Sequence, residues 1–154
     1  MLDKSGISAE ELGGIVTVST TGIATPSLDA LLIERMRLPR NLARLPIFGL
    51  GCAGGVIGLA RAAEMASALP GKTVLMLVVE LCTLSFRRGD EAKSNIVATA
   101  LFGDGAAAAL LRSGNDGPAI IATGEHTWPQ SLDIMGWEVP MTGSGRSSRG
   151  ISRG

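Results

Sequence analysis

The sequence of 154 residues contains no tyrosine, one histidine and two cysteines, and only 3% of its residues are aromatic. An interior with so few rings must be built from small aliphatic side chains, so we expect its layers to pack closely. A structural zinc site needs about four Cys or His ligands at short spacings, and Cys52, Cys82 and His126 lack that spacing. The sequence therefore predicts no metal site.

The chain also has no excess of positive or negative charge, because 14 Lys and Arg residues balance 14 Asp and Glu residues. This balance gives no electrostatic basis for binding nucleic acid or an anionic membrane. The longest apolar run, Thr73–Val79, is too short to cross a bilayer. The opening MLDKSGISAEEL lacks the apolar core of a secretory signal, and two cysteines without such a signal indicate reduced thiols, so we expect a cytoplasmic protein with no membrane span.

What is present suits one packed domain, since 45% of the residues are apolar and 18% are charged. Apolar β-rich runs alternate with helical patterns, which is typical of βαβ units. The expected strands are Gly14–Ser19, Leu45–Phe48, Thr73–Val79, Ala106–Leu111 and Pro118–Thr123. A first helix is expected to end over Ser8–Leu12, and three more are expected over Ser27–Met36, Val56–Leu69 and Ser94–Leu101. Ser27 is the expected N-cap of its helix, and the helix Val56–Leu69 is expected to be mostly buried. The order predicts an α/β layered fold with a mixed sheet.

The most informative segment is FGLGCAGGVIGLARAAEMASAL, residues 48–69, in which a strand passes through glycines into a helix. Cys52 lies in that turn and is a candidate nucleophile, because flanking glycines let the chain turn sharply and let a substrate approach. The start of a helix favours a thiolate through its dipole and its unpaired N–H groups. The chemistry that this position indicates is thioester exchange.

Two other interpretations fit the same residues. A free cysteine is often a small buried apolar filler. Gly49, Gly51 and Gly54 also form GxGxxG between a strand and a helix, as in a dinucleotide-binding turn, and Glu80 ends the next strand. Pro46 inside the preceding strand and the long distance to Glu80 count against that turn. From the residues alone, all three interpretations stay open.

The chain resembles type III polyketide synthases of the chalcone synthase family in three motifs that keep the family's order and spacing. These are GLGCAGG (Gly49–Gly55), VVELCTLSF (Val78–Phe86) and ALFGDGAAAALL (Ala100–Leu111). STTGIATPS (Ser19–Ser27) and HTWPQSLDIMGW (His126–Trp137) resemble bacterial members of the alkylresorcinol and alkylpyrone synthase type. The resemblance implies a thiolase-like layered fold, of which residues 1–139 form an incomplete N-terminal half.

The resemblance also implies a reaction. Members of the family load a starter from acyl-CoA onto a cysteine and extend it by decarboxylative condensation with malonyl-CoA, as homodimers and without a bound cofactor. On that pattern Cys52 is the acyl-accepting nucleophile, and Phe102 gates the pocket. The positions that shape the starter and elongation cavity are Thr20, Thr21, Cys82 and Ser85.

The family mechanism further needs a histidine and an asparagine that stabilise developing charge, and their motifs do not occur here. Asn41, Asn95 and Asn115 do not match, and His126 reads as a surface loop residue. We therefore expect an acyltransferase fragment that is inactive alone. The alternatives are an enzyme similar to ketoacyl-carrier-protein synthase III, and a non-catalytic remnant or pairing subunit.

Residues 140–154, PMTGSGRSSRGISRG, have almost nothing to bury, which predicts disorder. On the family pattern, the segment after GWEV would read approximately DDGLG. Reading codons for DDGLG one nucleotide late gives MTGS, so a frameshift is our hypothesis for this tail. Resequencing the gene tests it.

Overall fold

The computed structural model describes residues 2–86, 89, 91–114, 117–132, 134, 136–138 and 150–152. They fall into two units, the first comprising residues 1–79 and 106–125 and the second comprising residues 80–105 and 126–154. Of the predicted tail over 140–154, all but residues 150–152 lie outside the described residues.

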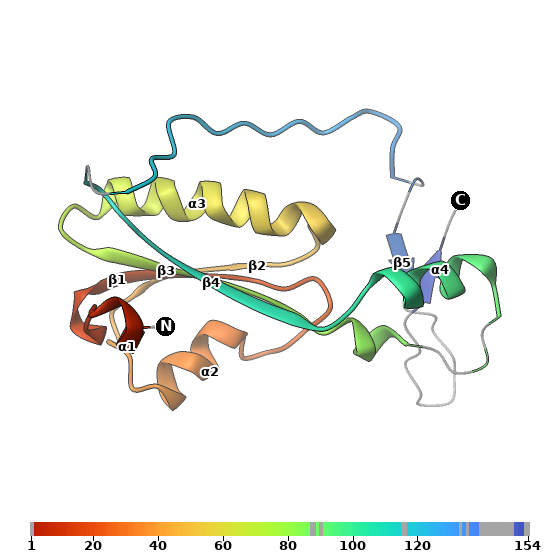
Figure 1. The fold of residues 1–154 in the computed structure, drawn as a ribbon, viewed down its shortest axis with the longest axis horizontal. Helices are drawn as coiled ribbons and strands as arrows, with labels where there is room; N and C mark the ends of the chain where they lie inside the picture. Colours follow the sequence, from red (N-terminus) through yellow and green to blue (C-terminus); the bar gives the residue numbers. More distant parts are fainter. Residues whose placement is uncertain are drawn as a thin grey trace. The chain divides into compact units, whose positions relative to one another are not determined.

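In the part of the chain that the structure describes, four strands and three α-helices make up most of the first unit, and Figure 1 shows their arrangement. The chain order is α1 (Leu2–Ser5), a 3-10 turn η1 (Ala9–Glu11), β1 (Leu12–Val18), α2 (Leu28–Arg35), β2 (Ala43–Ile47), a 3-10 turn η2 (Gly51–Ala53), α3 (Gly54–Ala68), β3 (Thr73–Glu80) and β4 (Gly105–Arg112). The strands lie in the order β2-β1-β3-β4 in a mixed sheet, as predicted.

The strand expected over Pro118–Thr123 is wrong, because this segment belongs to no strand. In Figure 1 it is part of a long connection without regular structure. Ile121 is 95% exposed. Its isoleucines have high β propensity, but a strand also requires a neighbouring strand to satisfy its backbone groups.

The central strand β1 runs parallel to both neighbours, with Val18 level with Ile47 of β2 and Val78 of β3. The carboxyl ends of the three strands therefore meet at one edge of the sheet, which we call the carboxyl edge. In open α/β sheets this is the edge at which functional loops gather.

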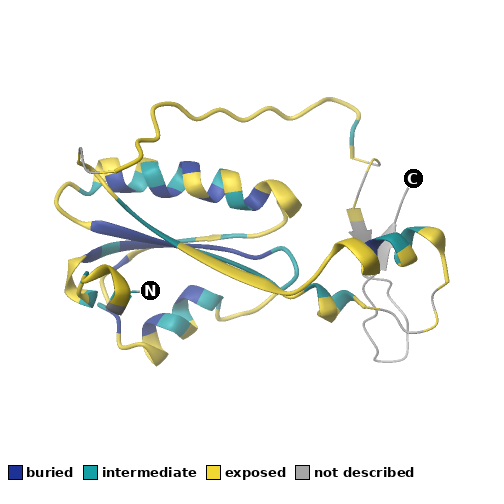
Figure 2. Cartoon of the chain, viewed as in Figure 1, coloured by how far each residue is buried: buried dark blue, intermediate teal, exposed yellow. Residues whose placement is uncertain are grey.

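Helices cover both faces of this sheet, with α3 on one and α2 on the other (Figure 1). Ile15 and Leu75 belong to the core beneath α2, whereas their neighbours Val16, Val74 and Met76 belong to the core beneath α3. Residues of opposite parity thus enter opposite layers, as the two-residue period of a strand requires. Figure 2 shows the resulting concentration of buried residues in β1 and β3.

Close packing between α3 and β1 depends on two glycines. A Cβ atom at Gly58 would lie 2.6 Å from Cγ2 of Val18, and one at Gly54 would lie 2.7 Å from Cγ1 of the same residue. These distances confirm the expected close layers. The helix is buried on this face only, since Val56 is 75% exposed, so the expectation of a mostly buried helix is wrong. An apolar sequence does not by itself show which residues will cover each side.

The second unit contains a 3-10 turn η3 (Cys82–Ser85), helix α4 (Lys93–Leu101) and strands β5 (Gly136–Glu138) and β6 (Gly150–Ser152). β5 and β6 pair antiparallel, with Trp137 opposite Ile151.

Candidate active site

Cys52 lies in η2, between the end of β2 and the start of α3. Cys52 is exposed, so the interpretation of this cysteine as a buried apolar filler is wrong. Gly49 has φ +84° and Gly51 has φ +54°, and both values lie in the left-handed region that favours glycine. The helix begins at Gly54, two residues earlier than predicted, and the cysteine turn leads directly into it. The predicted strand, glycine turn and helix are all confirmed.

The end of β1 contacts this turn. The Ser19 backbone N–H donates to the Ile47 carbonyl oxygen at 3.1 Å, which joins the ends of β1 and β2. The Gly51 N–H donates to the Thr20 Oγ1 at 3.0 Å. Sequence reasoning placed Thr20 in the substrate cavity, and it missed this contact with the backbone next to Cys52.

A cavity of about 270 Å³ opens at the same carboxyl edge. Its lining comes from the ends of β1 and β2, the loop after β1 and the start of α2, namely Thr17, Ser19, Gly22, Ile23, Ala24, Ser27, Leu28, Pro46, Ile47 and Phe48. Thr20 and Thr21 are half-buried and lie between the lining residues Ser19 and Gly22. The structure thus places both threonines in the loop that borders this cavity.

Within the second unit, one carboxylate joins two segments. Asp104 accepts hydrogen bonds from the backbone N–H of Thr83 at 2.9 Å and from its hydroxyl at 2.7 Å. The hydrogen bond from the Thr83 backbone N–H, and then the one from the Thr83 hydroxyl, lower the pKa of the Asp104 carboxyl. Asp104 thereby connects η3, which contains Cys82 and Ser85, to the turn that contains Phe102.

The predicted site residues thus divide between the units. Cys52, Thr20 and Thr21 belong to the first unit. Cys82, Ser85 and Phe102 belong to the second, where Cys82 and Ser85 are half-buried and Phe102 is 41% exposed.

An ion pair with one buried partner, the carboxylate, secures β2, the strand that leads to Cys52. Asp29 of α2 is fully buried, and its Oδ2 accepts a hydrogen bond of 2.5 Å from Nε of Arg44 in β2. Burial raises the pKa of Asp29, but hydrogen bonds from Arg44 and Ser27 and the charge of Arg44 outweigh it, so the pKa lies below its usual value. Ser27 precedes α2 as predicted, yet it makes no side-chain cap and instead accepts from Arg44 at 3.1 Å.

Comparison with known proteins settles the family. Residues 1–118 match the family model for the N-terminal domain of chalcone and stilbene synthases. The chain belongs to the chalcone and stilbene synthase family. The dinucleotide-binding interpretation of Gly49, Gly51 and Gly54 is therefore wrong.

Two curated relatives are enzymes of Streptomyces species. The chain is 42% identical to 1,3,6,8-tetrahydroxynaphthalene synthase of Streptomyces peucetius subsp. caesius, with 92% of this chain and 39% of the relative covered. It is 32% identical to 3,5-dihydroxyphenylacetyl-CoA synthase of Streptomyces toyocaensis, with 89% of this chain and 37% of the relative covered. The chain thus spans about two-fifths of the length of these curated relatives.

Solved structures confirm the thiolase-like fold of type III polyketide synthases. The 1,3,6,8-tetrahydroxynaphthalene synthase of Streptomyces coelicolor A3(2), a bacterial type III polyketide synthase, matches with a TM-score of 0.88 and 30% identity. The match covers 99% of this chain and 42% of that chain. The germicidin synthase of the same species, at 24% identity, matches in fold with a TM-score of 0.85.

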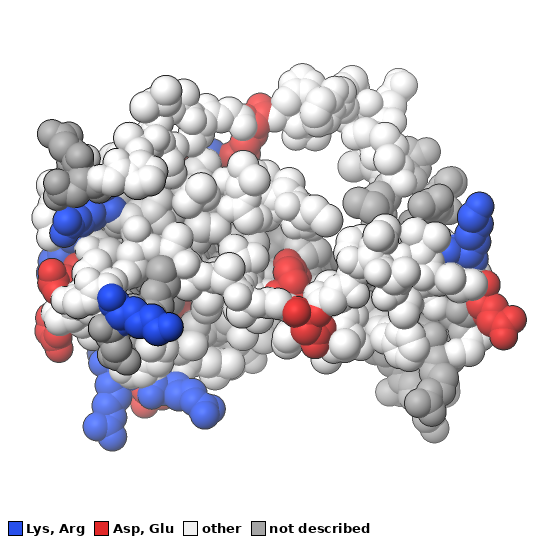
Figure 3. Space-filling view, in the orientation of Figure 1, with Lys and Arg blue, Asp and Glu red and all other residues white. Residues whose placement is uncertain are grey.

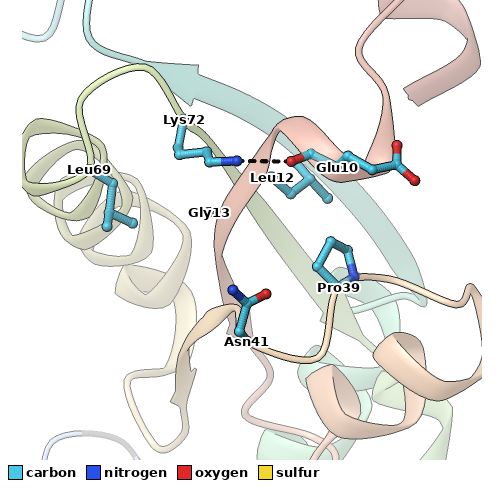
Figure 4. Close-up of a pocket in the computed structure, with 7 residues that line it drawn as sticks. All are labelled: Glu10, Leu12, Gly13, Pro39, Asn41, Leu69 and Lys72. Atoms are coloured by element: carbon cyan, nitrogen blue, oxygen red, sulfur yellow. Dashed lines mark hydrogen bonds between the residues drawn. The ribbon is translucent and has the colours of Figure 1, made fainter.

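A second cavity of the first unit, of about 400 Å³, is drawn in Figure 4, and Cys52 is not among its lining residues. It includes Leu12 and Gly13 at the amino end of β1, and Lys72 Nζ donates to the Glu10 carbonyl oxygen across it at 3.0 Å. The length of β1 separates this cavity from the carboxyl edge by about 20 Å, at ~3.3 Å per strand residue. It is not part of the candidate active site.

Within the described ranges, the remaining polar features offer no competing site. On the face drawn in Figure 3, the charged side chains are scattered and of both signs. His126 is exposed and its ring packs edge-on against Trp128 at 4.7 Å, in agreement with a surface loop. Among the described residues, no group of three or more Cys, His, Asp or Glu side chains has the arrangement of a metal site. No described helix is long and apolar enough to span a membrane.

Proposed function

We propose that this chain supplies the acyl-loading part of a type III polyketide synthase, with Cys52 as the residue that accepts the acyl group. The observation that carries the proposal is an exposed thiol in a glycine turn at the carboxyl edge of the sheet, directly before α3. An exposed thiol can meet a large thioester such as acyl-CoA, and its position at the start of a long helix suits a nucleophile.

The loading step is a transfer between two thioesters. The deprotonated Sγ of Cys52 attacks the carbonyl carbon of the acyl-CoA, a new C–S bond forms, and the bond to the CoA sulfur breaks. The thiol proton of Cys52 goes to solvent, and the departing CoA thiolate takes up a proton. The N–H groups in the first turn of α3 have no partners inside the helix and favour negative charge developing nearby. This step needs no bound cofactor.

We assign the cavity-forming residues by family pattern. Thr20 and Thr21 are the proposed cavity positions of the first unit. Cys82, Ser85 and Phe102 are the positions of the second unit that match the family pattern. Small side chains leave room for a growing chain. Phe102, which directly follows α4 and is 41% exposed, is the proposed gate.

The subsequent condensation needs groups outside these 154 residues. Decarboxylation of malonyl-CoA produces an enolate whose carbon attacks the acyl group on Cys52, and stabilising that enolate requires positioned donors. No histidine or asparagine of this chain stands in the family motif for that task. We therefore propose that the chain loads an acyl group but does not condense it alone.

The assembly and product also stay proposals. Among the described strands, β2 lies at an edge of the four-stranded sheet, and an edge of this kind can pair with a second copy, in keeping with a homodimer. The names of the two curated relatives specify hydroxylated aromatic products without a long alkyl chain, so we favour a product of that kind over a long-chain resorcinol or pyrone.

Mass spectrometry of the intact chain tests the loading step. The chain is incubated separately with hexanoyl-CoA and malonyl-CoA, digested, and searched for acylated peptides. We expect acylation at Cys52 that persists in Cys82→Ala and disappears in Cys52→Ala. Acylation at Cys82 alone, or none in a folded chain, contradicts the proposal and favours a non-catalytic pairing subunit.

A further inference from the structure

The last residues of β1 form the support beneath the turn of Cys52. The Val18 side chain, 1% exposed, packs against Gly54 and Gly58 of α3 at distances that leave no space for a Cβ on either glycine. The next residue, Ser19, is tied to Ile47 at the end of β2 by a backbone hydrogen bond of 3.1 Å. This short segment, Val18 at the end of β1 and Ser19 after it, is therefore fixed both to the helix that follows Cys52 and to the strand that precedes it.

Thr20 continues this segment and reaches the turn itself. Its Oγ1 accepts the hydrogen bond from the Gly51 N–H at 3.0 Å, although 31 positions separate the two residues. The first N–H groups of a helical turn have no partner within the turn, and a side-chain oxygen at the N-cap usually satisfies one of them. The N-cap of η2 is Leu50, which has no such oxygen. Thr20 supplies the missing acceptor from another part of the chain.

The bonded residue is also the one that orients the cysteine. Gly51 has φ +54° and directly precedes Cys52. A change in the backbone dihedral angles of Gly51 would therefore redirect the Cys52 side chain. We propose that Thr20 is a positioning residue, whose hydroxyl oxygen holds Gly51 and thereby aims Cys52 at its acyl donor. This inference rests on the proposed function of Cys52 and goes beyond the family assignment of Thr20 to the cavity wall.

Two substitutions separate this role from that of a cavity wall. Thr20→Val keeps the shape of the side chain and removes the acceptor, whereas Thr20→Ser keeps the acceptor and removes a methyl group. A wall residue would tolerate valine, because valine preserves volume. A positioning residue tolerates serine.

The readout is the rate at which iodoacetamide alkylates Cys52 at neutral pH in the 154-residue chain, followed by peptide mass spectrometry. Cys82 in the same sample is the internal reference. We expect Thr20→Val to slow alkylation of Cys52 relative to Cys82 by roughly three- to tenfold, the rate equivalent of about one hydrogen bond. Thr20→Ser should stay within about twofold of the unmodified chain, by the same reasoning.

Thr99→Val is the matched control. Thr99 is exposed on α4 and donates to the Asn95 carbonyl oxygen at 2.8 Å, so this substitution also removes a threonine hydroxyl hydrogen bond. It should leave the Cys52 rate unchanged. Equal rates for Thr20→Val and the unmodified chain overturn the inference, as does a Thr20→Ser rate as low as that of Thr20→Val.

Gly51→Ala provides a second route if Thr20→Val does not fold. No atom lies within 4 Å of the position of the new Cβ, so the alanine disturbs only the left-handed backbone of the turn. We expect the same slowing, and an unchanged rate overturns the inference. Failure of acyl-CoA to modify the unmodified chain would defeat the proposed function alone, because alkylation still reports how Cys52 is held.

Discussion

Two carboxylates, Asp29 and Asp104, each join separate segments beside the candidate site residues, and they do so in different environments. Asp29 is fully buried and binds the partly exposed Arg44 of β2, the strand that runs toward Cys52. Asp104 is exposed and binds Thr83, next to Cys82. In the unit that contains Cys52 the connecting carboxylate is buried within the fold, whereas in the second unit the hydrogen bonds that hold the segment of Cys82 and Ser85 are open to water.

Breaking the buried pair should have the largest effect. Arg44→Met leaves the Asp29 carboxylate buried without its cation, and we expect a loss of about 2–4 kcal/mol in unfolding free energy. Urea denaturation measures it. Arg40→Met is the control, because Arg40 and its partner Glu34 are 71% and 70% exposed, and we expect no measurable loss of stability. Equal losses for both variants would remove the distinction between the buried and exposed pairs.

The same pair predicts a dependence on pH. The pKa of Asp29 is lowered in the folded chain, so its contribution to stability is present above the pKa of the unfolded chain and is lost as the pH falls through the folded value. Unfolding free energy should therefore decline below about pH 4. The decline should be smaller in Arg44→Met, and an identical decline in both chains contradicts the role of Arg44.

Adding one methyl group at the contact of α3 with β1 should have the next largest effect. Gly58→Ala places a Cβ 2.6 Å from Val18 Cγ2 and 3.1 Å from Met76 Cε, and we expect destabilisation of about 1–3 kcal/mol despite the better helix propensity of alanine. Gly55→Ala, whose Cβ would meet nothing within 4 Å, should be neutral or slightly stabilising. A stable Gly58→Ala chain would show that the close packing of α3 on Val18 is dispensable.

Removing the exposed Asp104 carboxylate should have the smallest effect on stability. It should also change the reactivity of the nearby thiol of Cys82. Asp104→Ala removes both bonds to Thr83, and η3 loses its connection to the turn that contains Phe102. We expect faster alkylation of Cys82 and little change at Cys52. Thr83→Val, which keeps the backbone bond, should cause a smaller increase. No change at Cys82 in either variant would show that Asp104 does not hold η3.

The features that could be predicted from the sequence are those set by neighbouring residues. The glycines around Cys52 mark a turn wherever they occur between a strand and a helix, and the turn was predicted with its helix start only two residues late. Strand β1 begins at Leu12, earlier than the predicted Gly14, because Leu12 is paired with Thr73 of β3. Pairing of that kind depends on a partner that local patterns do not reveal.

The side-chain hydrogen bonds near the candidate site residues could not be predicted for the same reason. Thr20 and Gly51 are 31 positions apart, Thr83 and Asp104 are 21 apart, and Asp29 and Arg44 are 15 apart. The sequence predicts Ser27 as a helix cap, since that is the local role of such a residue, and no local pattern pairs Asp104 with Thr83. Only the fold brings their actual partners within hydrogen-bonding distance.

The central claim is that Cys52, and not Cys82, is the thiol that accepts an acyl group. Competition between acyl-CoA and iodoacetamide tests it most directly, with the label at each cysteine measured in the same chain. Prior incubation with acyl-CoA should protect Cys52 from alkylation and leave Cys82 unprotected, and hydroxylamine, which cleaves thioesters, should restore labelling of Cys52. Equal protection of both thiols, or protection of neither, would contradict the account.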